Sequence, residues 1–284
     1  MNVYWIPTRV IEEWLREDIP FGDLTTNALG IADKPSVAEV IVRESGVICG
    51  LEEASRIYGT LGASCELFVK DGDKVGPGAL ALKAKGSAKA LHAAWRAAQV
   101  VIEYASGVAT KTWKLVSKAR SVNPKVVIAT TRKAPPGARS LYFKAVLSGG
   151  GIIHRASLSE TILIFHNHVS LIGGFEEALQ KALEARRRWP EKKLAFEVGS
   201  IEEALKAAET GIDEVQLDHI GIDELKRLVP KLRELNPQII IAVAGGIDEH
   251  NIEEYASTGV DVIVTSAPYH AKPLNITTKI YAAT

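Results

Sequence analysis

From residue 126 to residue 264, the chain repeats one pattern: a short apolar run, then an amphipathic stretch with apolar residues at helical spacing. The apolar runs are Val126–Ala129, Thr161–Ile164, Leu194–Val198, Glu214–Leu217, Ile239–Val243 and Asp261–Val264. The amphipathic stretches include Phe175–Arg188, Ile201–Glu209, Ile222–Leu235 and Glu249–Ser257. Alternating strands and helices predict a parallel sheet covered by helices. About six or seven strands come close to closing a barrel, so we expect an incomplete, TIM-like α/β barrel, with an open doubly wound sheet as the alternative.

The N-terminal part of the chain has a different rhythm. Ser36–Glu44 predicts a strand and Leu51–Leu61 a short helix, while Cys65–Lys83 holds two strand-like runs around a turn rich in Gly, Pro and Asp. That turn resembles the hairpins of biotinyl and lipoyl carrier domains, which present a modifiable lysine at the tip. Lys83 and Lys85 lack the neighbours of such a lysine, so we interpret the segment as a structural hairpin.

A long helical pattern follows over Ser87–Arg120. It contains Ser106–Gly107, and glycine costs a helix interior about 1 kcal/mol. We therefore expect a break in the helix at this point.

Charge and composition exclude several classes of function. The 284 residues carry 34 basic and 34 acidic side chains, so no global field attracts nucleic acid or an anionic membrane. No apolar run is long enough to span a bilayer, and the first residues do not have the pattern of a secretory signal. The two cysteines are too few for a disulfide framework. We expect a cytoplasmic protein with small-molecule ligands.

Polar or glycine-rich residues follow each predicted strand of the barrel. They are Thr130–Lys133, His166–His168, Glu197, Asp218–His219, Gly245–Gly246 and Thr265–Ser266. A polar residue at the end of one strand needs no explanation beyond the start of a loop. Because the carboxyl ends of parallel strands meet on one face of a barrel, six such ends predict a shared site.

The residue types at these ends suit an anionic substrate. Arg132, Lys133, His154 and Arg155 can bind carboxylate or phosphate oxygens, and arginine can do so with two parallel hydrogen bonds. Gly245–Gly246, just before a predicted helix, leaves backbone N–H groups available for a phosphate.

Two acidic residues complete the set. Glu197 and Asp218 suit sugar hydroxyls, or Mg²⁺ bound to a phosphate-bearing substrate. A two-carboxylate glycosidase is the competing interpretation, but it leaves the surrounding cations unexplained. His166 and His168 would suit a zinc site only with a third ligand, which the sequence does not identify.

Several segments carry a family likeness. They are EDIPFGDLTT (Glu17–Thr26), ASGVAT (Ala105–Thr110), TRKAPPGAR (Thr131–Arg139), KAVLSGGGIIHRASLSETILIF (Lys144–Phe165), Leu217–Asp218 and AGGI (Ala244–Ile247). In this order, over nearly the whole chain, they resemble the quinolinate phosphoribosyltransferases. The resemblance implies an N-terminal α/β sandwich domain over residues 1–100, joined by a C-terminal tail of residues 270–284, and an α/β barrel over residues 101–269.

The resemblance also implies an activity and an assembly. Family members join a pyridine carboxylate to phosphoribosyl pyrophosphate with Mg²⁺, releasing pyrophosphate and, for quinolinate, carbon dioxide. They act as dimers whose sites borrow an arginine from the neighbouring subunit. We therefore expect a homodimer that binds phosphoribosyl pyrophosphate and a heteroaromatic acid.

Site residues carry over by motif. Arg96 matches the borrowed arginine. Arg132, His154 and Arg155 match residues that bind the acid's carboxylates, and Lys133 matches a residue near the pyrophosphate. Glu197 and Asp218 match the acidic pair at the ribose and Mg²⁺. Gly245, Gly246 and Ser266 fall where the 5-phosphate is held.

Three departures from the family pattern alter the acceptor side. The family's LIKDNH becomes Leu163–His168 here, so Phe165 replaces a carboxylate-binding lysine. A paired E-x-E keeps only Glu197, and in the family's EASGGI segment Ala242 replaces another carboxylate. A charged hydrogen bond is worth roughly 1.5–3 kcal/mol. Phe165 offers a stacking surface instead, so quinolinate should be a poor substrate.

These departures resemble the ModD branch of the family. We expect a phosphoribosyltransferase with a carboxylated heteroaromatic acceptor that the sequence does not identify. The alternatives are quinolinate phosphoribosyltransferase proper, a homologue that binds phosphoribosyl pyrophosphate without catalysis, or another phosphate-using barrel enzyme.

Overall fold

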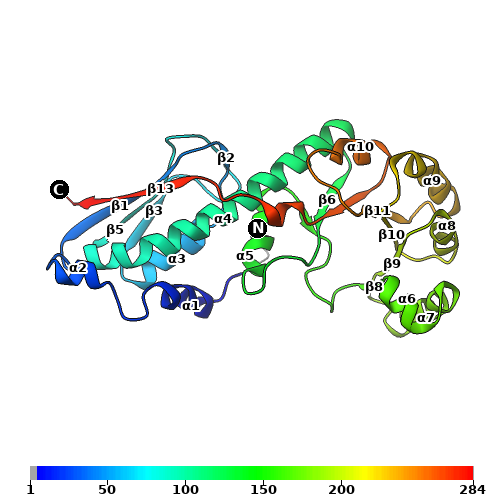
Figure 1. Cartoon of the computed structure of the whole chain (residues 1–284), viewed down its shortest axis with the longest axis horizontal. Helices are drawn as coiled ribbons and strands as arrows, with labels where there is room; N and C mark the ends of the chain where they lie inside the picture. Colours follow the sequence, from blue (N-terminus) through cyan, green and yellow to red (C-terminus); the bar gives the residue numbers. More distant parts are fainter. Residues whose placement is uncertain (1–4, 284) are drawn as a thin grey trace. The chain divides into compact units, whose positions relative to one another are not determined.

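The computed structural model describes residues 5–283, and the chain divides into two compact units. The first unit takes in the chain up to Trp113, then Ala134–Gly150, and the chain from Pro268 onward. The second unit consists of Lys114–Lys133 and Gly151–Ala267. Each unit is built on its own sheet (Figure 1).

The first unit contains an antiparallel sheet of four strands in the order β13-β1-β5-β3. The strands are β13 (Ile276–Ala282), β1 (Pro35–Val42), β5 (Leu80–Ser87) and β3 (Ser64–Leu67). Two short strands, β2 (Gly46–Val47) and β4 (Lys74–Val75), pair separately. The C-terminal strand therefore forms one edge of a sheet whose other strands come from the first third of the chain.

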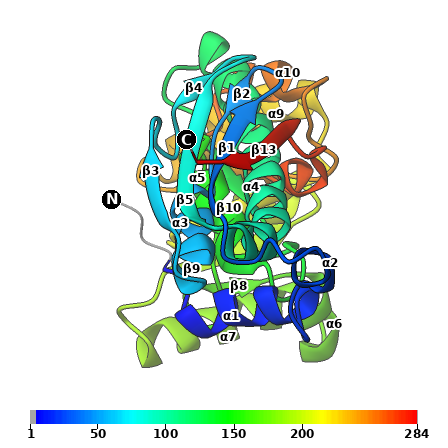
Figure 2. The ribbon, with the colours of Figure 1, turned by 90° about the vertical axis from the view of Figure 1, so that its left-hand side faces the viewer.

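The ribbons of α3 (Leu51–Thr60) and of the first part of α4 (Ala88–Val122) run beside this sheet (Figure 2). The other helical elements of the unit are α1 (Thr8–Asp18), α2 (Leu24–Ala28), α5 (Arg139–Ser148) and most of the 3₁₀ turn η1 (Ala267–His270). α3 contacts β3 and β5 and buries Ile57 and Tyr58 completely. The predicted α/β sandwich is thus confirmed.

The segment that resembled a carrier-domain hairpin is structural. Lys83 and Lys85 lie within β5, not at a turn. Lys83 faces Glu39 of β1, with its Nζ 2.9 Å from a carboxylate oxygen. Neither lysine therefore stands at the tip of a hairpin, where a carrier domain presents its modifiable lysine.

The predicted break at Ser106–Gly107 is wrong, because α4 is continuous. Ser106 Oγ accepts a hydrogen bond from the Cys49 N–H at 2.9 Å, so this turn of the helix is anchored. A Cβ on Gly107 would collide with the carbonyl oxygen of Lys272. Glycine is needed here for a close approach of two backbones, and packing outweighs its low helix propensity.

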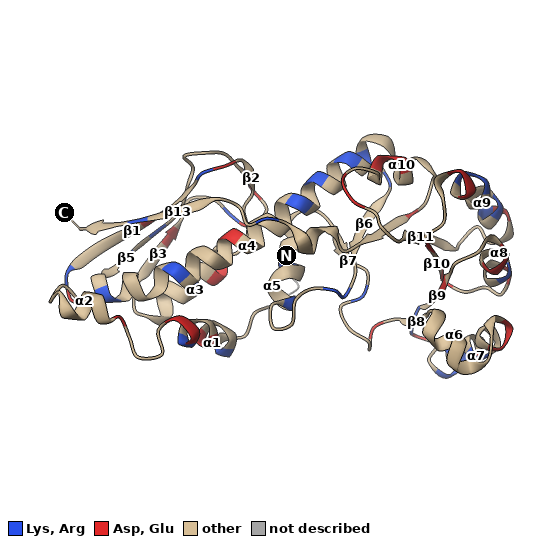
Figure 3. Cartoon of the chain, in the orientation of Figure 1, with Lys and Arg blue, Asp and Glu red and all other residues tan. Residues whose placement is uncertain are grey.

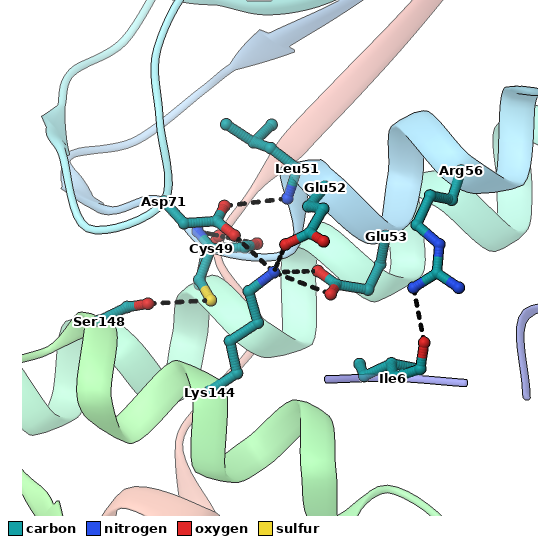
Figure 4. Close-up of polar contacts among 10 residues, drawn as sticks. Ile6, Cys49, Leu51, Glu52, Glu53, Arg56, Asp71, Lys144 and Ser148 are labelled. Atoms are coloured by element: carbon teal, nitrogen blue, oxygen red, sulfur yellow. Dashed lines mark hydrogen bonds and ion pairs between the residues drawn. The ribbon is translucent and has the colours of Figure 1, made fainter. Parts of the chain in front are cut away.

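A buried ion cluster joins three segments of the first unit (Figure 4). Lys144 of α5 has a side chain that is only 1% exposed, and its Nζ lies 2.7 Å from Glu53, 2.9 Å from Glu52 and 3.0 Å from Asp71. Asp71 also accepts a hydrogen bond from the Leu51 N–H at the start of α3. Burial raises the pKa of Glu53 even though Lys144 donates to it. Lys144 therefore neutralises a carboxylate that is expensive to bury alone.

The second unit contains a sheet of seven parallel strands in the order β7-β6-β12-β11-β10-β9-β8. The strands are β6 (Val127–Thr130), β7 (Ile152–Ile153), β8 (Ile162–Ile164), β9 (Leu194–Val198), β10 (Glu214–Asp218), β11 (Ile240–Ala244) and β12 (Val262–Thr265). The helices are the end of α4, α6 (His166–Ile172), α7 (Phe175–Arg188), α8 (Ile201–Glu209), α9 (Ile222–Leu235) and α10 (Ile252–Ser257). The incomplete barrel is confirmed, with β7 and β8 as its two edge strands.

β7 is the strand that the sequence pattern did not identify. It has only two residues, and Ile152 is exposed. So short a run has neither the apolar length nor the alternation that marks a strand.

The two faces of the seven-stranded sheet differ. On the helix side, Phe196 of β9 and Leu217 of β10 belong to the main core. On the other side, which we call the inner face, small apolar residues of β6, β11 and β12 form a second cluster: Ala129, Ala242, Ala244, Val262 and Val264. Strand register places Gln216 beside Ala242 and opposite Glu197, so these polar side chains share the inner face.

Charged residues of both signs are interspersed along the helices of each unit (Figure 3). α7, α8 and α9 each carry Lys or Arg together with Asp or Glu. None of the described helices is both long and apolar enough to cross a membrane.

Replacing Lys144 by methionine should destabilise the protein by about 3–5 kcal/mol, because it leaves the Glu53 carboxylate buried without a partner. The loss should shrink as the pH falls toward the ordinary carboxyl value of 4.5. A carboxyl whose pKa is raised in the folded state binds its proton more tightly there than in the unfolded state, so acid favours the folded state. Urea unfolding of wild type and Lys144→Met from pH 7 to pH 5 measures both effects.

Lys89→Met is the matched control, since Lys89 is exposed on α4 of the same unit. It should change the free energy of unfolding by less than about 0.5 kcal/mol. An equal loss in the two variants, or a loss for Lys144→Met that does not vary with pH, would contradict this account of the cluster.

Candidate active site

The carboxyl end of the inner face collects most of the residues that the sequence predicted. Glu197 of β9 and Gln216 of β10 are register partners, and the Gln216 amide donates to a Glu197 oxygen. Asp218 follows two residues later on the same strand, so it lies on the same face nearer the strand end. The acidic pair is therefore brought together by two adjacent strands.

His154 reaches the same face from the far edge of the sheet. It lies directly after β7, and its Nε2 is 2.6 Å from an oxygen of Glu214 at the start of β10. Three strands separate β7 from β10 in the sheet order, so this contact requires a strongly curled sheet. Both side chains are only 11% exposed.

Two arginines lie close to this network. Burial and the positive charge of Arg132 lower the pKa of Arg155, while the charge of Glu197 acts in the opposite direction. Arg155 is 9% exposed, and no carboxylate in the described part of the chain comes within ion-pair distance of it. Two like charges held together without a direct counter-ion form a natural anion site.

The acidic pair has the complementary character. Burial, and next the negative charge of Asp218, raise the pKa of Glu197 above that of an ordinary carboxyl. Asp218 has a side chain that is 37% exposed. Two carboxylates that repel each other at a strand end suit hydroxyl donors or a hard cation.

A double-glycine loop follows β11. Gly245 and Gly246 both have positive φ angles, +99° and +63°, which glycine adopts without strain. Asn251 donates from its side chain to the Gly246 carbonyl at 3.0 Å and holds the loop. Within the described chain, the backbone N–H groups of Gly245, Gly246 and Ser266 donate no hydrogen bond. These donors are available to an anion.

The loop after β10 packs against this glycine loop. His219 has a φ of +56°, which is uncommon for a residue with a side chain, and its N–H donates to the Ala244 carbonyl at 3.1 Å. A Cβ on Gly245 would lie 2.8 Å from the His219 ring. The two strand-end loops are thus mutually positioned.

The end of β8 carries Phe165 and two histidines. Leu163 pairs with Ala195, which places Phe165 on the inner face two residues later. The Phe165 and His168 rings meet edge to face at 4.3 Å, and His166 lies 3.5 Å from Ser170 Oγ. Among the described residues, no three His, Cys, Asp or Glu side chains are grouped as metal ligands.

Two predicted residues are not tied to the network. Lys133 is exposed, and its backbone N–H donates to Thr131 Oγ1 at 3.3 Å. Arg96 belongs to the first unit, where its guanidinium lies over the Trp95 ring at 3.9 Å. It is exposed on α4.

Glu214 and Gln216 are inner-face residues that the strand-end argument missed. The signal was present in the alternation of β10, where polar Glu214, Gln216 and Asp218 alternate with apolar Val215 and Leu217. An alternation of this kind predicts that all three polar side chains share one face. The strand-end argument considered only the last residue of the strand.

Comparison with known protein families gives two matches that together span most of the chain. Residues 23–106 match the N-terminal domain of quinolinate phosphoribosyl transferase, and residues 108–279 match its C-terminal domain.

Individual relatives agree. A putative pyrophosphorylase ModD of Pasteurella multocida is 38% identical over 266 residues and covers 94% of each chain. A probable nicotinate-nucleotide pyrophosphorylase of Archaeoglobus fulgidus is 35% identical over 257 residues, covering 90% of this chain and 96% of its own. The solved nicotinate-nucleotide pyrophosphorylase of Francisella tularensis superposes with a TM-score of 0.90 at 29% identity, with 99% of each chain covered. The chain therefore belongs to the quinolinate phosphoribosyltransferase family, as a ModD-like member.

Proposed function

We propose that this protein transfers the phosphoribosyl group of phosphoribosyl pyrophosphate to a carboxylated nitrogen heterocycle other than quinolinate, with release of pyrophosphate. The observation that carries the proposal is the convergence of Arg132, Arg155 and the Glu197–Asp218 pair at one end of the inner face. Binding a single anion would not require the acidic pair, which argues for a sugar donor.

On the donor side, Glu197 and Asp218 would orient the ribose hydroxyls, and the N–H groups of Gly245, Gly246 and Ser266 would hold the 5-phosphate. The acceptor's ring nitrogen would attack the anomeric carbon with its lone pair while the bond to pyrophosphate breaks and its electrons leave with the pyrophosphate. Lys133 would stabilise that departing charge. A ring nitrogen with a free lone pair needs no general base.

The donor set of Glu197 and Asp218 fits Mg²⁺. Glu197 and Asp218 are hard oxygen donors whose mutual repulsion a cation would relieve. Mg²⁺ usually takes only one or two protein carboxylates and completes its shell with water and substrate phosphates. When bound, it would supply positive charge to the pyrophosphate.

On the acceptor side, Arg132, His154 and Arg155 would hold the acid. Phe165 would face the ring with an aromatic surface where the family pattern has a lysine, so one carboxylate loses its cation. We therefore expect quinolinate to be a weak acceptor and decarboxylation to be absent.

Arg96 would complete the acceptor site of a neighbouring subunit in a homodimer. It is exposed in the first unit, whereas Arg132, His154 and Arg155 belong to the second. A cytoplasmic location stays a prediction.

Pyrophosphate release is the direct test of the function. The protein, phosphoribosyl pyrophosphate and Mg²⁺ should release pyrophosphate with one or more heteroaromatic monocarboxylic acids and only slowly with quinolinate. Arg132→Ala should lower kcat/KM roughly ten- to a hundredfold, the value of one charged hydrogen bond.

Arg188→Ala is the control for that loss, because Arg188 is exposed on α7 of the same unit. It should leave kcat/KM unchanged. Brisk turnover of quinolinate would show that Phe165 does not exclude the second carboxylate, and donor binding without pyrophosphate release would favour a non-catalytic homologue.

Sharing of sites between subunits can be tested by coexpressing two inactive variants, Arg96→Ala and Asp218→Asn. In a mixed dimer one site has an intact barrel and receives an intact Arg96, so random pairing should restore about a quarter of the wild-type activity. Each variant alone should be nearly inactive. A mixture as inactive as its components would mean that Arg96 does not act across an interface.

The double-glycine loop after β11 should lose more stability when Gly245 is replaced by alanine than when Gly246 is. Alanine at either position has an unfavourable left-handed backbone, which costs roughly 1–2 kcal/mol. Only at Gly245 would the new Cβ also meet the His219 ring, whereas nothing lies within 4 Å at Gly246. Gly245→Ala should therefore lose about 1–3 kcal/mol more in urea unfolding.

His219→Ala in the same chain should recover most of that additional loss, since it removes the ring. Equal losses for the two glycine variants would contradict the packing of the two loops.

A further inference from the structure

Two buried side chains of β10 have no role in the proposed reaction so far. Glu214 is 8% exposed and Gln216 is 5% exposed, and both lie on the inner face with Asp218. Val215 and Leu217, which alternate with them, belong to the helix-side core. A strand in the middle of a sheet does not need two buried polar side chains for packing.

Gln216 has a half-satisfied amide. Its Nε2 donates to Glu197, the register partner on β9. Its Oε1 is buried and accepts no hydrogen bond from the described residues. A carboxylate can only accept, so the amide nitrogen must face Glu197 and the carbonyl oxygen must be the free end. A buried acceptor without a donor points to a ligand or water that carries an N–H or O–H.

Glu214 changes the charge of the same face. Its carboxylate lies 2.6 Å from Nε2 of His154 and accepts a hydrogen bond from it, so one of the two ring nitrogens of His154 is occupied within the protein. The face then holds three carboxylates, on Glu197, Glu214 and Asp218, against the two guanidiniums of Arg132 and Arg155 and the imidazole of His154, which is already engaged by Glu214. Such a balance favours an acceptor with one negative charge over one with two.

We propose that the acceptor is a nitrogen heterocycle with a single carboxylate, bound by Arg155, and with an amino or ring N–H group that donates to Gln216 Oε1. Glu214 and Gln216 are then specificity-determining residues: Gln216 selects the donor group, and Glu214 rejects a second carboxylate. This inference rests on the proposed function, whose acceptor it narrows to a class.

A series of pyridine acids tests the proposal, because they differ only in a ring substituent. Quinolinate has a carboxylate beside the nitrogen, nicotinate has hydrogen there, and 2-aminonicotinate has an amino group; 6-aminonicotinate places the amino group on the other side. Dissociation constants are measured by calorimetry with phosphoribosyl pyrophosphate and Mg²⁺ present, and pyrophosphate release is followed in parallel. At least one of the two aminonicotinates should bind about tenfold or more tightly than nicotinate, and quinolinate should bind most weakly.

Gln216→Met removes the acceptor oxygen with little change in volume. It should bring the dissociation constants of the better-bound aminonicotinate and of nicotinate close to equality, so that their ratio is near one. The ratio is taken within one variant, so any effect that reaches the donor side through Glu197 cancels. Gln238→Met, an exposed position in the same unit, should keep the wild-type ratio.

Glu214→Gln is a gain-of-function test that loss of folding cannot imitate. The amide oxygen still accepts from His154, while one negative charge is removed. Quinolinate should then gain several-fold in affinity relative to nicotinate.

Each contrary result is distinct. If Gln216→Met leaves the ratio of the aminonicotinate and nicotinate dissociation constants unchanged, water satisfies Oε1. If quinolinate binds as tightly as the aminonicotinates, Glu214 does not reject it. Either result overturns the inference. Binding of phosphoribosyl pyrophosphate with no binding of any of the four acids also overturns it but leaves the donor side of the proposed function intact. No binding of phosphoribosyl pyrophosphate would overturn the proposed function itself.

Discussion

The curl of the seven-stranded parallel sheet is the constraint on which the candidate site depends. His154 follows β7 at one edge, yet it contacts Glu214 on β10, although three strands lie between β7 and β10 in the sheet order. In a flat sheet, strands lie about 4.8 Å apart, so that contact would be out of reach. The inner face can curl because Ala129, Ala242 and Ala244 are small, while the bulky aliphatic side chains lie on the helix side. Curvature thus brings the end of β7 to the face of β10 that carries Asp218.

Within that site, charges are arranged in pairs that would be unfavourable alone. Arg155 beside Arg132 and Glu197 beside Asp218 each raise the cost of the charged state of a neighbour. Such pairs are tolerated where a ligand of opposite charge completes them. By contrast, the buried Lys144 cluster of the first unit is complete within the chain, which marks it as structural. The two clusters show how the same residue types can stabilise a fold or await a substrate.

On the acceptor side, three residues disfavour a dicarboxylate. Phe165 stands where the family pattern has a lysine, and Glu214 places a buried carboxylate beside His154. Gln216 presents a buried carbonyl oxygen that accepts no hydrogen bond from the described residues. All three lower the affinity expected for a dicarboxylate. The donor side, with Glu197, Asp218 and the double glycine, keeps residues that suit a phosphorylated sugar.

The sequence by itself determined the class of fold, because apolar periodicity is a local property: α7, α8 and α9 begin and end where the amphipathic pattern predicted. It also identified the strand-end residues, since a parallel sheet must bring those ends together. Predictions from the sequence were wrong or incomplete where a contact between distant segments determines the local structure. Gly107 stays inside a helix because the backbone at Lys272 packs against it, and β7 forms because β6 supplies its partner. Only the tertiary structure paired Glu214 with His154 and left Gln216 Oε1 without a donor among residues 5–283, because those facts depend on distances across a curled sheet that no local pattern encodes.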